Sequence, residues 1–376
     1  MLMRIALFHS TLPSPTRKVG GVEVVVHRLA NHLVLTGHDV TVFSLSARPD
    51  DALYAHQHLF SEWPSLRTHS LLRMFVLPLL LNLVSFRDFD VVHFHGDDWG
   101  YLRRRTPSVR TMHGSAREEA RTATSWKRRL AQWLLYPLEQ LSTRLASLSL
   151  AVGPKTARLY PQTVLVNNGV DVARFRPGPK SPLPSILFVG TWAGRKRGAF
   201  LFDVFRNEVL PNVPTATLTM VSDHVSDDCA AHPSVEHYAY VSDEDLARFY
   251  RESWVFAFPS TYEGFGLPYV ESLASGTAVL SSPNDGAEYV LDAGAYGRIV
   301  PDAQFGTALT TLLRDAEARA EFERQGPVRA ETFSWTTVAR THEYLYAAAQ
   351  NGRPVLNQPA GAPHASDAPS SVLPHS

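Results

Sequence analysis

The sequence has one cysteine, Cys229, among its 376 residues. A single cysteine excludes an intramolecular disulfide framework, a cysteine zinc site and an iron–sulfur cluster, and it fits a reducing compartment such as the cytoplasm. The chain also has no excess of charge, because 36 Lys and Arg residues balance 36 Asp and Glu residues. This balance excludes a chain-wide electrostatic attraction to nucleic acid, so we expect no nucleic-acid partner.

Long hydrophobic runs are absent as well. The longest, Met74–Leu81, is far shorter than the roughly 20 apolar residues of a membrane-spanning helix. We expect a buried or half-buried helix there, with a membrane-touching surface as the alternative. The N-terminus, MLMRIALFHS, does not have the long apolar core of a secretion signal and predicts a first buried strand.

Apolar residues make up 44% of the chain, which is enough to fill two cores. They form short runs that alternate with helical patterns. The predicted strands are Arg4–Phe8, Val40–Ser44, Val91–His95, Leu148–Val152, Ile186–Val189, Thr217–Val221, Val255–Phe258 and Ala278–Ser281. The predicted helices include Val22–Leu35, Leu246–Arg251, Pro268–Ser275 and Thr307–Glu323. Buried strands separated by helices indicate the α/β class with parallel sheets.

A cluster of prolines divides the chain into halves. Pro177, Pro179, Pro182 and Pro184 fall within PGPKSPLP, directly before the strand SILFVG, and prolines at this density stiffen an extended linker. We therefore expect one doubly wound domain over 1–176 and a second over 177–335. A helix over 336–350 then docks back on the domains, and the proline-containing remainder, 351–376, forms a disordered tail.

Basic residues concentrate in one stretch, although the total charge is zero. The segment 99–160 has 12 Lys or Arg residues against three Glu, and Trp126 and Trp133 lie within it in WKRRLAQW. One interpretation is a solvated helix face. The other is a surface that approaches anionic lipid or a phosphorylated acceptor, that is, a peripheral membrane contact.

The segment Ser260–Ser282, STYEGFGLPYVESLASGTAVLSS, carries the most chemistry. An apolar strand runs into a turn containing Gly264 and Gly266, which permit a tight bend and close approach of a ligand. The amides at the start of the following helix form an anion site suited to phosphate. Glu263 and Glu271 bracket this cradle, and carboxylates beside a phosphate site suggest a sugar nucleotide whose hydroxyls they bind. A structural turn with surface acids is the alternative.

Cations occur at the equivalent point of an earlier strand in the second half. Arg195 and Lys196, in GTWAGRKRG, lie where the first strand of the second half ends, which is where ligands bind in open α/β sheets. Two cations there would neutralise a diphosphate and stabilise it as a leaving group; two solvated charges are the alternative. Gly20 and Gly21 follow the first strand of the first half, and their amides would close on the same phosphates.

Histidines mark the ends of strands in the first half. His113, in TMHGS, follows a predicted strand and is a candidate hydrogen-bond donor to a bound sugar, with a structural role as the alternative. His93 and His95 share one face of a strand, but no third ligand accompanies them, so we predict no metal site there. The Asp88–Asp90 triplet is interpreted as an ordinary loop rather than as a metal site.

Taken together, these segments resemble retaining glycosyltransferase family 4, whose members have the two-domain GT-B fold. EGFGLPYVE matches the family's signature of two glutamates separated by seven residues, and GGVE, VNNGVDVARFRPG, VGTWAGRK, YVSDEDL and GAEYVL occur in the family's order. The resemblance covers roughly Arg4 to Ala348. It implies two Rossmann-like doubly wound domains facing across a cleft, an N-terminal acceptor-binding domain and a C-terminal nucleotide-sugar-binding domain.

The resemblance also implies residue roles. Glu263 would contact hydroxyls of the transferred sugar as a catalytic residue, and Glu271 would hold the ribose. Backbone donors would come from Gly264, Phe265, Gly266 and Leu267. Arg195 and Lys196 would bind the diphosphate, Gly20 and Gly21 would close over it, His113 would meet the sugar, and Val241 would lie beside the base. Many members carry Arg where this chain has Thr191, and Arg195 would supply the missing charge.

For the reaction, the resemblance implies metal-independent transfer with retention of configuration, from a nucleotide-diphosphate sugar and without any cofactor. The acceptor would be a glycan, a lipid-linked molecule or a small molecule, with cell-envelope glycan synthesis as the expected process. A sugar-nucleotide epimerase and transfer to a soluble natural product are the alternatives. A dehydrogenase is disfavoured because GFGLPY ends in Tyr where the dinucleotide motif needs Gly. A degenerate, non-catalytic sugar-nucleotide binder is the non-enzyme alternative.

Overall fold

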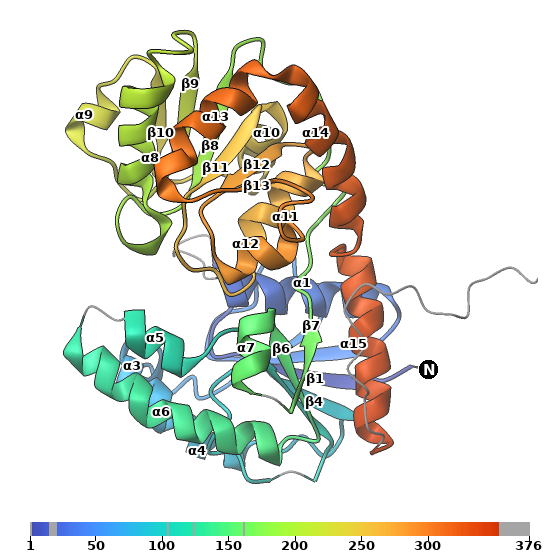
Figure 1. Ribbon diagram of the computed structural model, residues 1–376. Coiled ribbons are helices and arrows are strands. Elements are labelled where there is room, and N and C mark those ends of the chain that lie inside the picture. Colours follow the sequence, from blue (N-terminus) through green and yellow to red (C-terminus); the bar gives the residue numbers. More distant parts are fainter. Residues whose placement is uncertain (1, 15–20, 104, 123–124, 161, 353–376) are drawn as a thin grey trace, which may run out of the picture.

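The computed structural model describes residues 2–14, 21–103, 105–122, 125–160 and 162–352. The chain forms two lobes, one above the other, each built around its own parallel sheet (Figure 1). The first sheet uses strands between Arg4 and Val166, and the second uses strands between Ser185 and Ile299. Gly20 and the tail 353–376 lie outside the described residues.

The N-terminal lobe contains a sheet of seven strands in the order β3-β2-β1-β4-β5-β6-β7. All neighbouring pairs are parallel; Ile5 of β1, for example, pairs with Val40 of β2 and with Val91 of β4. The strands are β1 (Arg4–Phe8), β2 (Asp39–Ser44), β3 (Ala55–His58), β4 (Val91–Phe94), β5 (Ser108–Met112), β6 (Leu148–Val152) and β7 (Thr163–Val166). The helices are α1 (Gly21–Leu35), α2 (Ser65–Thr68), α3 (Ser70–Phe75), α4 (Leu77–Leu80), α5 (Ala116–Thr122), α6 (Trp126–Leu145) and α7 (Pro154–Leu159).

The C-terminal lobe repeats this arrangement with six strands in the order β10-β9-β8-β11-β12-β13. The strands are β8 (Ser185–Val189), β9 (Thr217–Val221), β10 (Val235–Tyr238), β11 (Val255–Phe258), β12 (Ala278–Ser281) and β13 (Arg298–Ile299). The helices are α8 (Gly198–Val204), α9 (Asp227–Ala230), α10 (Asp243–Glu252), α11 (Leu267–Ala274), α12 (Asp285–Val290), α13 (Phe305–Arg314) and α14 (Ala316–Glu331). In each sheet the strand order reverses beside the first strand, between β1 and β4 and between β8 and β11. Ligands of doubly wound sheets bind at this switch point.

The central strands are apolar because helices cover both faces of each sheet. Every residue of β4, VVHF, and of β11, VFAF, is buried, which is the pattern of parallel strands without a solvent face. The last helix, α15 (Trp335–Gln350), returns to the N-terminal lobe, where it packs on α1, β4 and β5 (Figure 1). Its Trp335 stacks on His32 of α1, and the Tyr346 hydroxyl lies 2.8 Å from Nδ1 of His93.

The eight predicted strands are all present, each within one residue of its expected ends. The prediction of one helix over Thr307–Glu323 is wrong, because Asp315 ends α13 and its carboxylate caps α14 by accepting from the Ala318 amide. The apolar run Met74–Leu81 is divided between α3 and α4, with Pro78 in the first turn of α4. Among the described residues, no helix combines the length and apolarity needed to span a bilayer.

Candidate active site

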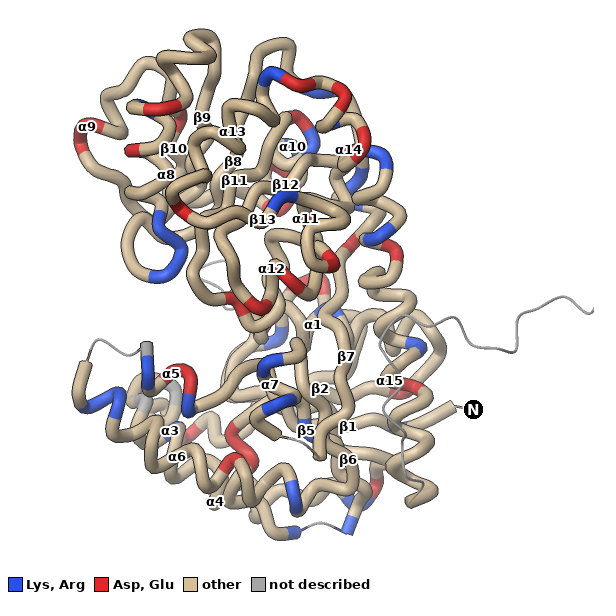
Figure 2. The backbone as a smooth tube through the Cα atoms, in the orientation of Figure 1, with Lys and Arg blue, Asp and Glu red and all other residues tan. Residues whose placement is uncertain are grey.

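The switch point of the C-terminal lobe brings together three of the predicted residues. Arg195 and Lys196 lie in the turn after β8, and Glu263 lies in the loop after the neighbouring β11. The Oε1 atom of Glu263 is 2.5 Å from Nη1 of Arg195 and 2.8 Å from Nζ of Lys196. Figure 2 shows the basic turn after β8 as a blue bend on the lower side of the upper lobe. The sequence pattern and the fold therefore agree on where opposite charges meet.

Local packing holds Glu263 in place. Its side chain is only 7% exposed, and its Oε1 also accepts a hydrogen bond of 2.7 Å from the Ser260 hydroxyl. Gly286, in α12, lies so close that a Cβ there would come within 2.7 Å of the Glu263 Cβ. A carboxylate this deeply buried stays charged only when cations and donors surround it, and the two cations and the hydroxyl meet that requirement.

Lys196 is the more buried of the two cations. Its Nζ lies 4.4 Å from the ring centre of Phe258, the last residue of β11. Burial lowers the pKa of Lys196, with Arg195 adding to the effect, while Glu263 opposes it. The Arg195 side chain is 45% exposed and also donates to the Tyr262 carbonyl at 2.6 Å. The site therefore has one buried cation and one at its edge.

Helix α11 contributes a free N-terminus and a second carboxyl. Gly266, with φ of 90°, turns the chain into the helix. Pro268 has no amide hydrogen and the Tyr269 amide donates to the Gly266 carbonyl at 3.0 Å, so the amides that face a ligand are those of Gly266 and Leu267. Glu271 lies one turn further along, half-buried. Burial raises the pKa of Glu271 to about 7, although the Tyr250 hydroxyl and Lys196 act to lower it. The Glu271 carboxyl therefore changes its charge near neutral pH.

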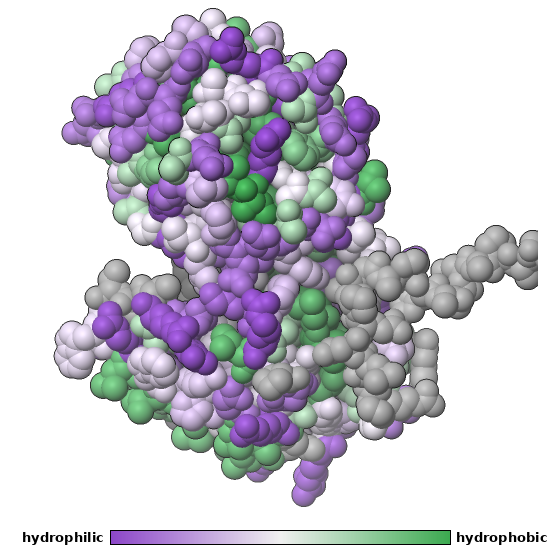
Figure 3. All heavy atoms as spheres, viewed as in Figure 1, coloured by the Kyte–Doolittle hydropathy of each residue, from purple (hydrophilic) through white to green (hydrophobic). Residues whose placement is uncertain are grey.

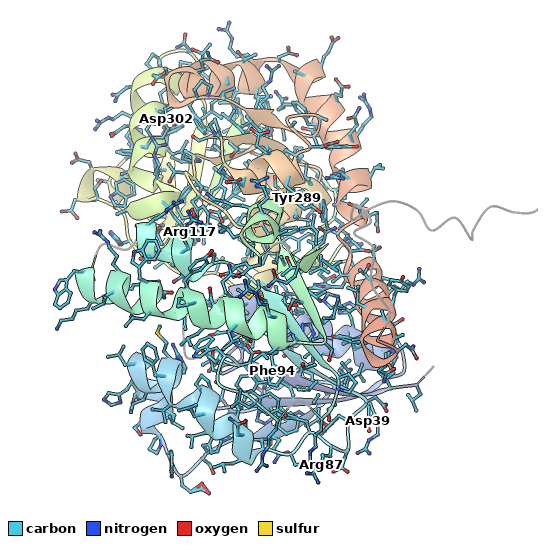
Figure 4. All side chains as sticks on the ribbon, turned by 60° about the horizontal axis from the view of Figure 1, so that its bottom comes forward. Asp39, Arg87, Phe94, Arg117, Tyr289 and Asp302 are labelled. Carbon is cyan, nitrogen blue, oxygen red and sulfur yellow. The ribbon has the colours of Figure 1, made fainter. Side chains whose placement is uncertain are left out.

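The two lobes touch beside this site. Gly21, the first residue of α1, is close enough to Leu267 that a Cβ on it would lie 3.9 Å from the leucine Cδ1. Gly153, with φ of 89°, faces the Gly264 carbonyl, and a Cβ on Gly153 would overlap that oxygen. Figure 4 shows Tyr289 where the lobes meet, and its hydroxyl donates to Asn167 across the boundary at 2.7 Å. The predicted Gly21 and Gly264 therefore both lie where the lobes touch, together with Gly153, which the sequence analysis did not single out.

His113 enters the same region from β5. Its backbone carbonyl lies 3.4 Å from the position that a Cβ of Gly264 would occupy. Nε2 of its ring is 2.9 Å from Nδ1 of His95, so only Nδ1 is left for a ligand. Burial lowers the pKa of His113 to about 3, and nearby His9 and His342 add to this. The ring is therefore neutral at physiological pH and acts as a hydrogen-bond partner rather than as a cation.

The remaining predicted positions lie around the same lobe. Thr191 follows β8, and its hydroxyl donates to the Ala193 carbonyl at 2.8 Å. Phe265 is buried against Tyr289 and Phe333. Val241 is half-buried directly before α10, whose first turn is capped by Ser242. The hydroxyl of Thr191 is therefore used within its own turn. Val241 follows the edge strand β10.

Comparison with known proteins decides the family. The model described as Glycosyltransferase Family 4 matches residues 19–174, and the one described as Glycosyl transferases group 1 matches residues 183–315. The chain is a member of glycosyltransferase family 4. A phosphatidyl-myo-inositol mannosyltransferase from Mycolicibacterium smegmatis is 27% identical to it over 351 residues, covering 85% of this chain and 88% of that relative.

Solved structures show the fold of this glycosyltransferase to be GT-B. Sucrose-phosphate synthase from Thermosynechococcus elongatus superposes with a TM-score of 0.70 at 19% identity, covering 92% of this chain and 98% of the other. Anabaena Alr3699/HepE in complex with UDP-glucose superposes with a TM-score of 0.69 at 15% identity, covering 92% and 100%. The expected fold class, two Rossmann-like domains facing across a cleft, is confirmed.

The glycosyltransferase also has a polar cavity that the sequence reasoning missed. It lies at the switch point of the N-terminal sheet and has a volume of about 350 Å³. Its lining residues are His9, Ser10, Thr11, Glu23, Arg73, Met74 and Asp97. The guanidinium of Arg73 has no ion pair or side-chain hydrogen bond within the described part of the chain. Asp97 has a φ of 55°, rare for a residue other than glycine. The sequence signal was available in HFHGDDW, because polar residues after β4 must face this switch point.

Proposed function

We propose that this glycosyltransferase moves a hexose from a nucleotide-diphosphate sugar to an acceptor hydroxyl, with retention of configuration and without a bound metal. The observation that carries the proposal is the convergence of Arg195, Lys196 and the N-terminus of α11 around the Glu263 carboxylate, at the carboxyl ends of β8 and β11. Positive charge at that point matches a diphosphate, and a carboxylate among those charges matches sugar hydroxyls.

Donor binding would exchange the partners of the two cations. In the structure, both cations contact a single oxygen of Glu263. A diphosphate brings more negative charge than one carboxylate, so Arg195 and Lys196 would turn toward it together with the free amides at Gly266 and Leu267. Glu263 would then be released to accept hydrogen bonds from the transferred sugar. Glu271 would accept from the ribose hydroxyls, and Val241 would lie beside the base.

In the reaction, the bond between the sugar C1 and the β-phosphate oxygen breaks, and a bond from C1 to the acceptor oxygen forms on the same face. The electron pair of the broken bond leaves with the diphosphate, and the acceptor proton passes to the departing phosphate oxygen. Arg195 and Lys196 would stabilise the charge that develops on that oxygen. His113, neutral because its pKa is depressed, would hold a sugar hydroxyl from the N-terminal lobe.

Metal independence is supported by the charges already present. Two cations and a helix N-terminus supply the positive charge that Mg²⁺ supplies in other phosphate sites. We therefore expect full turnover in the presence of EDTA. A requirement for a divalent cation that EDTA abolishes and excess Mg²⁺ restores would contradict this part of the proposal.

For the acceptor, we propose a glycan or a lipid-linked molecule that enters the cavity of the N-terminal lobe. The cavity lies at the carboxyl ends of the strands of its sheet, as the donor site does in the C-terminal lobe. It places a cation, Arg73, beside the acids Glu23 and Asp97. A hydroxylated acceptor with an anionic group fits these residues. The name of the mycobacterial relative, a phosphatidyl-myo-inositol mannosyltransferase, supports the same class. We also propose peripheral contact with the cytoplasmic face of a membrane through 99–160, in cell-envelope glycan synthesis.

The first test is a thermal-shift screen with UDP-, GDP- and dTDP-sugars, because a bound ligand stabilises the fold in proportion to the logarithm of concentration over Kd. The stabilising donor is then incubated with and without acceptor extracts, and the anomeric configuration of the product is read by NMR. Retention with acceptor-dependent consumption supports the proposal. Isomerised donor without acceptor would indicate an epimerase, and tight binding without turnover would indicate a non-catalytic binder.

A further inference from the structure

Helix α6 buries mainly polar side chains and exposes large apolar ones, whereas an ordinary surface helix does the reverse. Its buried positions are mostly polar, namely Gln132, Glu139, Ser142 and Thr143, with Leu135 the apolar exception. Six of its exposed positions are large and apolar, namely Trp126, Leu130, Trp133, Leu134, Leu141 and Leu145. Basic residues stand among them, because Lys127, Arg128, Arg129 and Arg144 are exposed as well. Trp126 is 69% exposed and Leu134 is 56% exposed. A soluble monomer rarely exposes so many large apolar side chains on one helix, so this face of α6 is a candidate docking surface.

The polar inner face is a built network, so the helix cannot simply rotate. Ser142 donates to Asp98 at 2.8 Å and also accepts from Arg110, whose guanidinium forms a buried ion pair with Asp98. The Glu139 carboxylate accepts from the Ala116 amide and from the Tyr160 hydroxyl. Rotating α6 to bury its tryptophans would break this buried ion pair and these hydrogen bonds, which is strongly unfavourable.

Exposed leucines of the neighbouring helices extend the stripe. One small core joins α3 to α6. In it, Met74 of α3 packs with Leu135 of α6 and with Trp99 from the loop after β4, so the two helices are neighbours. The exposed leucines on this part of the lobe are Leu71, Leu72, Leu79, Leu83 and Leu102. Figure 3 shows hydrophobic atoms along the lower edge of the N-terminal lobe, where Figure 1 places α4 and α6. We call this set, with the outward residues of α6, the α6 surface.

Unneutralised cations border the α6 surface. Arg87, Arg103 and Arg105 line a groove of about 180 Å³ and make no ion pair within the described residues. Lys127, beside Trp126, likewise contacts only that ring among described groups. Apolar side chains bordered by free cations match a bilayer with anionic headgroups, because the leucines and tryptophans enter the interface while the cations meet phosphates. A second copy fits less well, since its own free cations would repel these.

We propose that the α6 surface docks on an anionic lipid bilayer and presents a membrane-borne acceptor to the cavity of the N-terminal lobe. This rests on the proposed function, because it assumes that the acceptor is lipid-linked. Helix α3 joins the two sites: its Leu71 and Leu72 are exposed on the α6 surface, while Arg73 and Met74 line the cavity. An acceptor headgroup can therefore reach Arg73 while its acyl chains stay in the bilayer.

The test is flotation of the purified full chain with vesicles of phosphatidylcholine alone or with about 30% phosphatidylglycerol. The variant combines Trp126→Ser, Trp133→Ser and Leu134→Ser, all at exposed positions. The matched control combines Leu35→Ser, Leu183→Ser and Val328→Ser, which are equally exposed elsewhere. We expect the wild type and the control to float with anionic vesicles, and the variant to bind them at least about 10-fold more weakly.

Two further measurements separate the outcomes. The variant should keep the wild-type thermal shift with the donor sugar, because its substitutions are at exposed positions and none of them is a residue of the donor site. Wild-type protein that does not bind anionic vesicles would overturn the inference and the proposed membrane contact through 99–160, whereas the proposed sugar transfer would still stand. Vesicle binding without any donor-dependent thermal shift would refute the proposed function instead. Light scattering that shows a dimer abolished by the variant, together with no flotation, would identify a second copy as the occupant and also overturn the inference.

Discussion

The ionisation of Glu271 gives the sharpest test of the donor site. Burial raises the pKa of Glu271 to about 7. Ribose hydroxyls that donate to the carboxylate favour its charged form, so donor binding should lower this pKa and release a proton. If binding returns the group to its ordinary value, the affinity at about pH 5.5 is about 30-fold lower than at about pH 8.5, and almost one proton leaves near pH 6.

The assay is calorimetric titration with an intact nucleotide sugar, such as UDP-glucose or whichever donor stabilises the protein most. The intact sugar avoids the terminal phosphate of a free nucleoside diphosphate, which itself titrates in this range. Repeating the titration in two buffers of different ionisation enthalpy counts the protons released. Glu271→Gln should remove the pH dependence, whereas the exposed Glu244→Gln should keep it. An affinity that stays flat across this range in the wild type would refute the ribose role of Glu271.

Glu271 also predicts how stability depends on pH. Donor affinity should rise with pH, whereas the stability of the folded protein should fall. Because the folded pKa of Glu271 lies above its unfolded value, the folded state binds the proton more tightly. Its contribution to stability is fully present below about pH 4.5 and is lost as pH rises through about 7. The donor-free Tm of the wild type should therefore fall more steeply than that of Glu271→Gln between about pH 5 and pH 8, as measured by scanning calorimetry.

Three substitutions elsewhere follow from the contacts. Lys196→Ala removes a buried cation from the leaving-group site and should lower kcat by about 100-fold with a smaller effect on folding; a collapsed Tm with normal turnover per folded molecule would make Lys196 structural. Gly153→Ala places a Cβ against the Gly264 carbonyl and should separate the lobes, lowering kcat by about 100-fold while the donor thermal shift persists; unchanged kcat would show that this contact is dispensable. Asp98→Ala leaves Arg110 buried without its partner and should cost about 3–5 kcal/mol in urea denaturation, whereas a loss below 1 kcal/mol, on the order of a surface pair, would contradict the buried network.

Most central strands could be predicted from the sequence because burial on both faces makes them continuous apolar runs. Five strands lie outside the eight predicted ranges, namely β3, β5, β7, β10 and β13. The central strand β5, SVRTM, is buried although it contains polar residues, and only its end was expected, at His113. The edge strand β3, AHQH, is mostly exposed, and β10, VEHY, is only partly buried, so neither shows the apolar run that marks a central strand. The break between α13 and α14 also escaped, because the capping carboxylate of Asp315 interrupts a run whose apolar spacing continues on both sides.

For the site, the sequence located residues but not their partners. Gly-rich turns, helix starts and charges at strand ends are local signals, and they correctly brought Arg195, Lys196 and Glu263 to one place. The bond between His113 and His95, and the cavity around Arg73 and Asp97, arise from neighbouring strands and from α3. Both features depend on which strands and helices become neighbours in the fold, and a single sequence does not show this directly.

The charges of the donor site also explain why a transferase would keep two acids beside a phosphate site. Arg195 and Lys196 together exceed Glu263 by one positive charge, and the single buried carboxylate contacts both of them. A diphosphate with two negative charges reverses that balance, and about half a positive charge at the α11 terminus offsets part of the excess. Glu263 is then the group that must find new partners, and sugar hydroxyls provide hydrogen-bond donors without further charge. Glu271 can meet the ribose in the same way, since its raised pKa lets it stay neutral until those donors arrive.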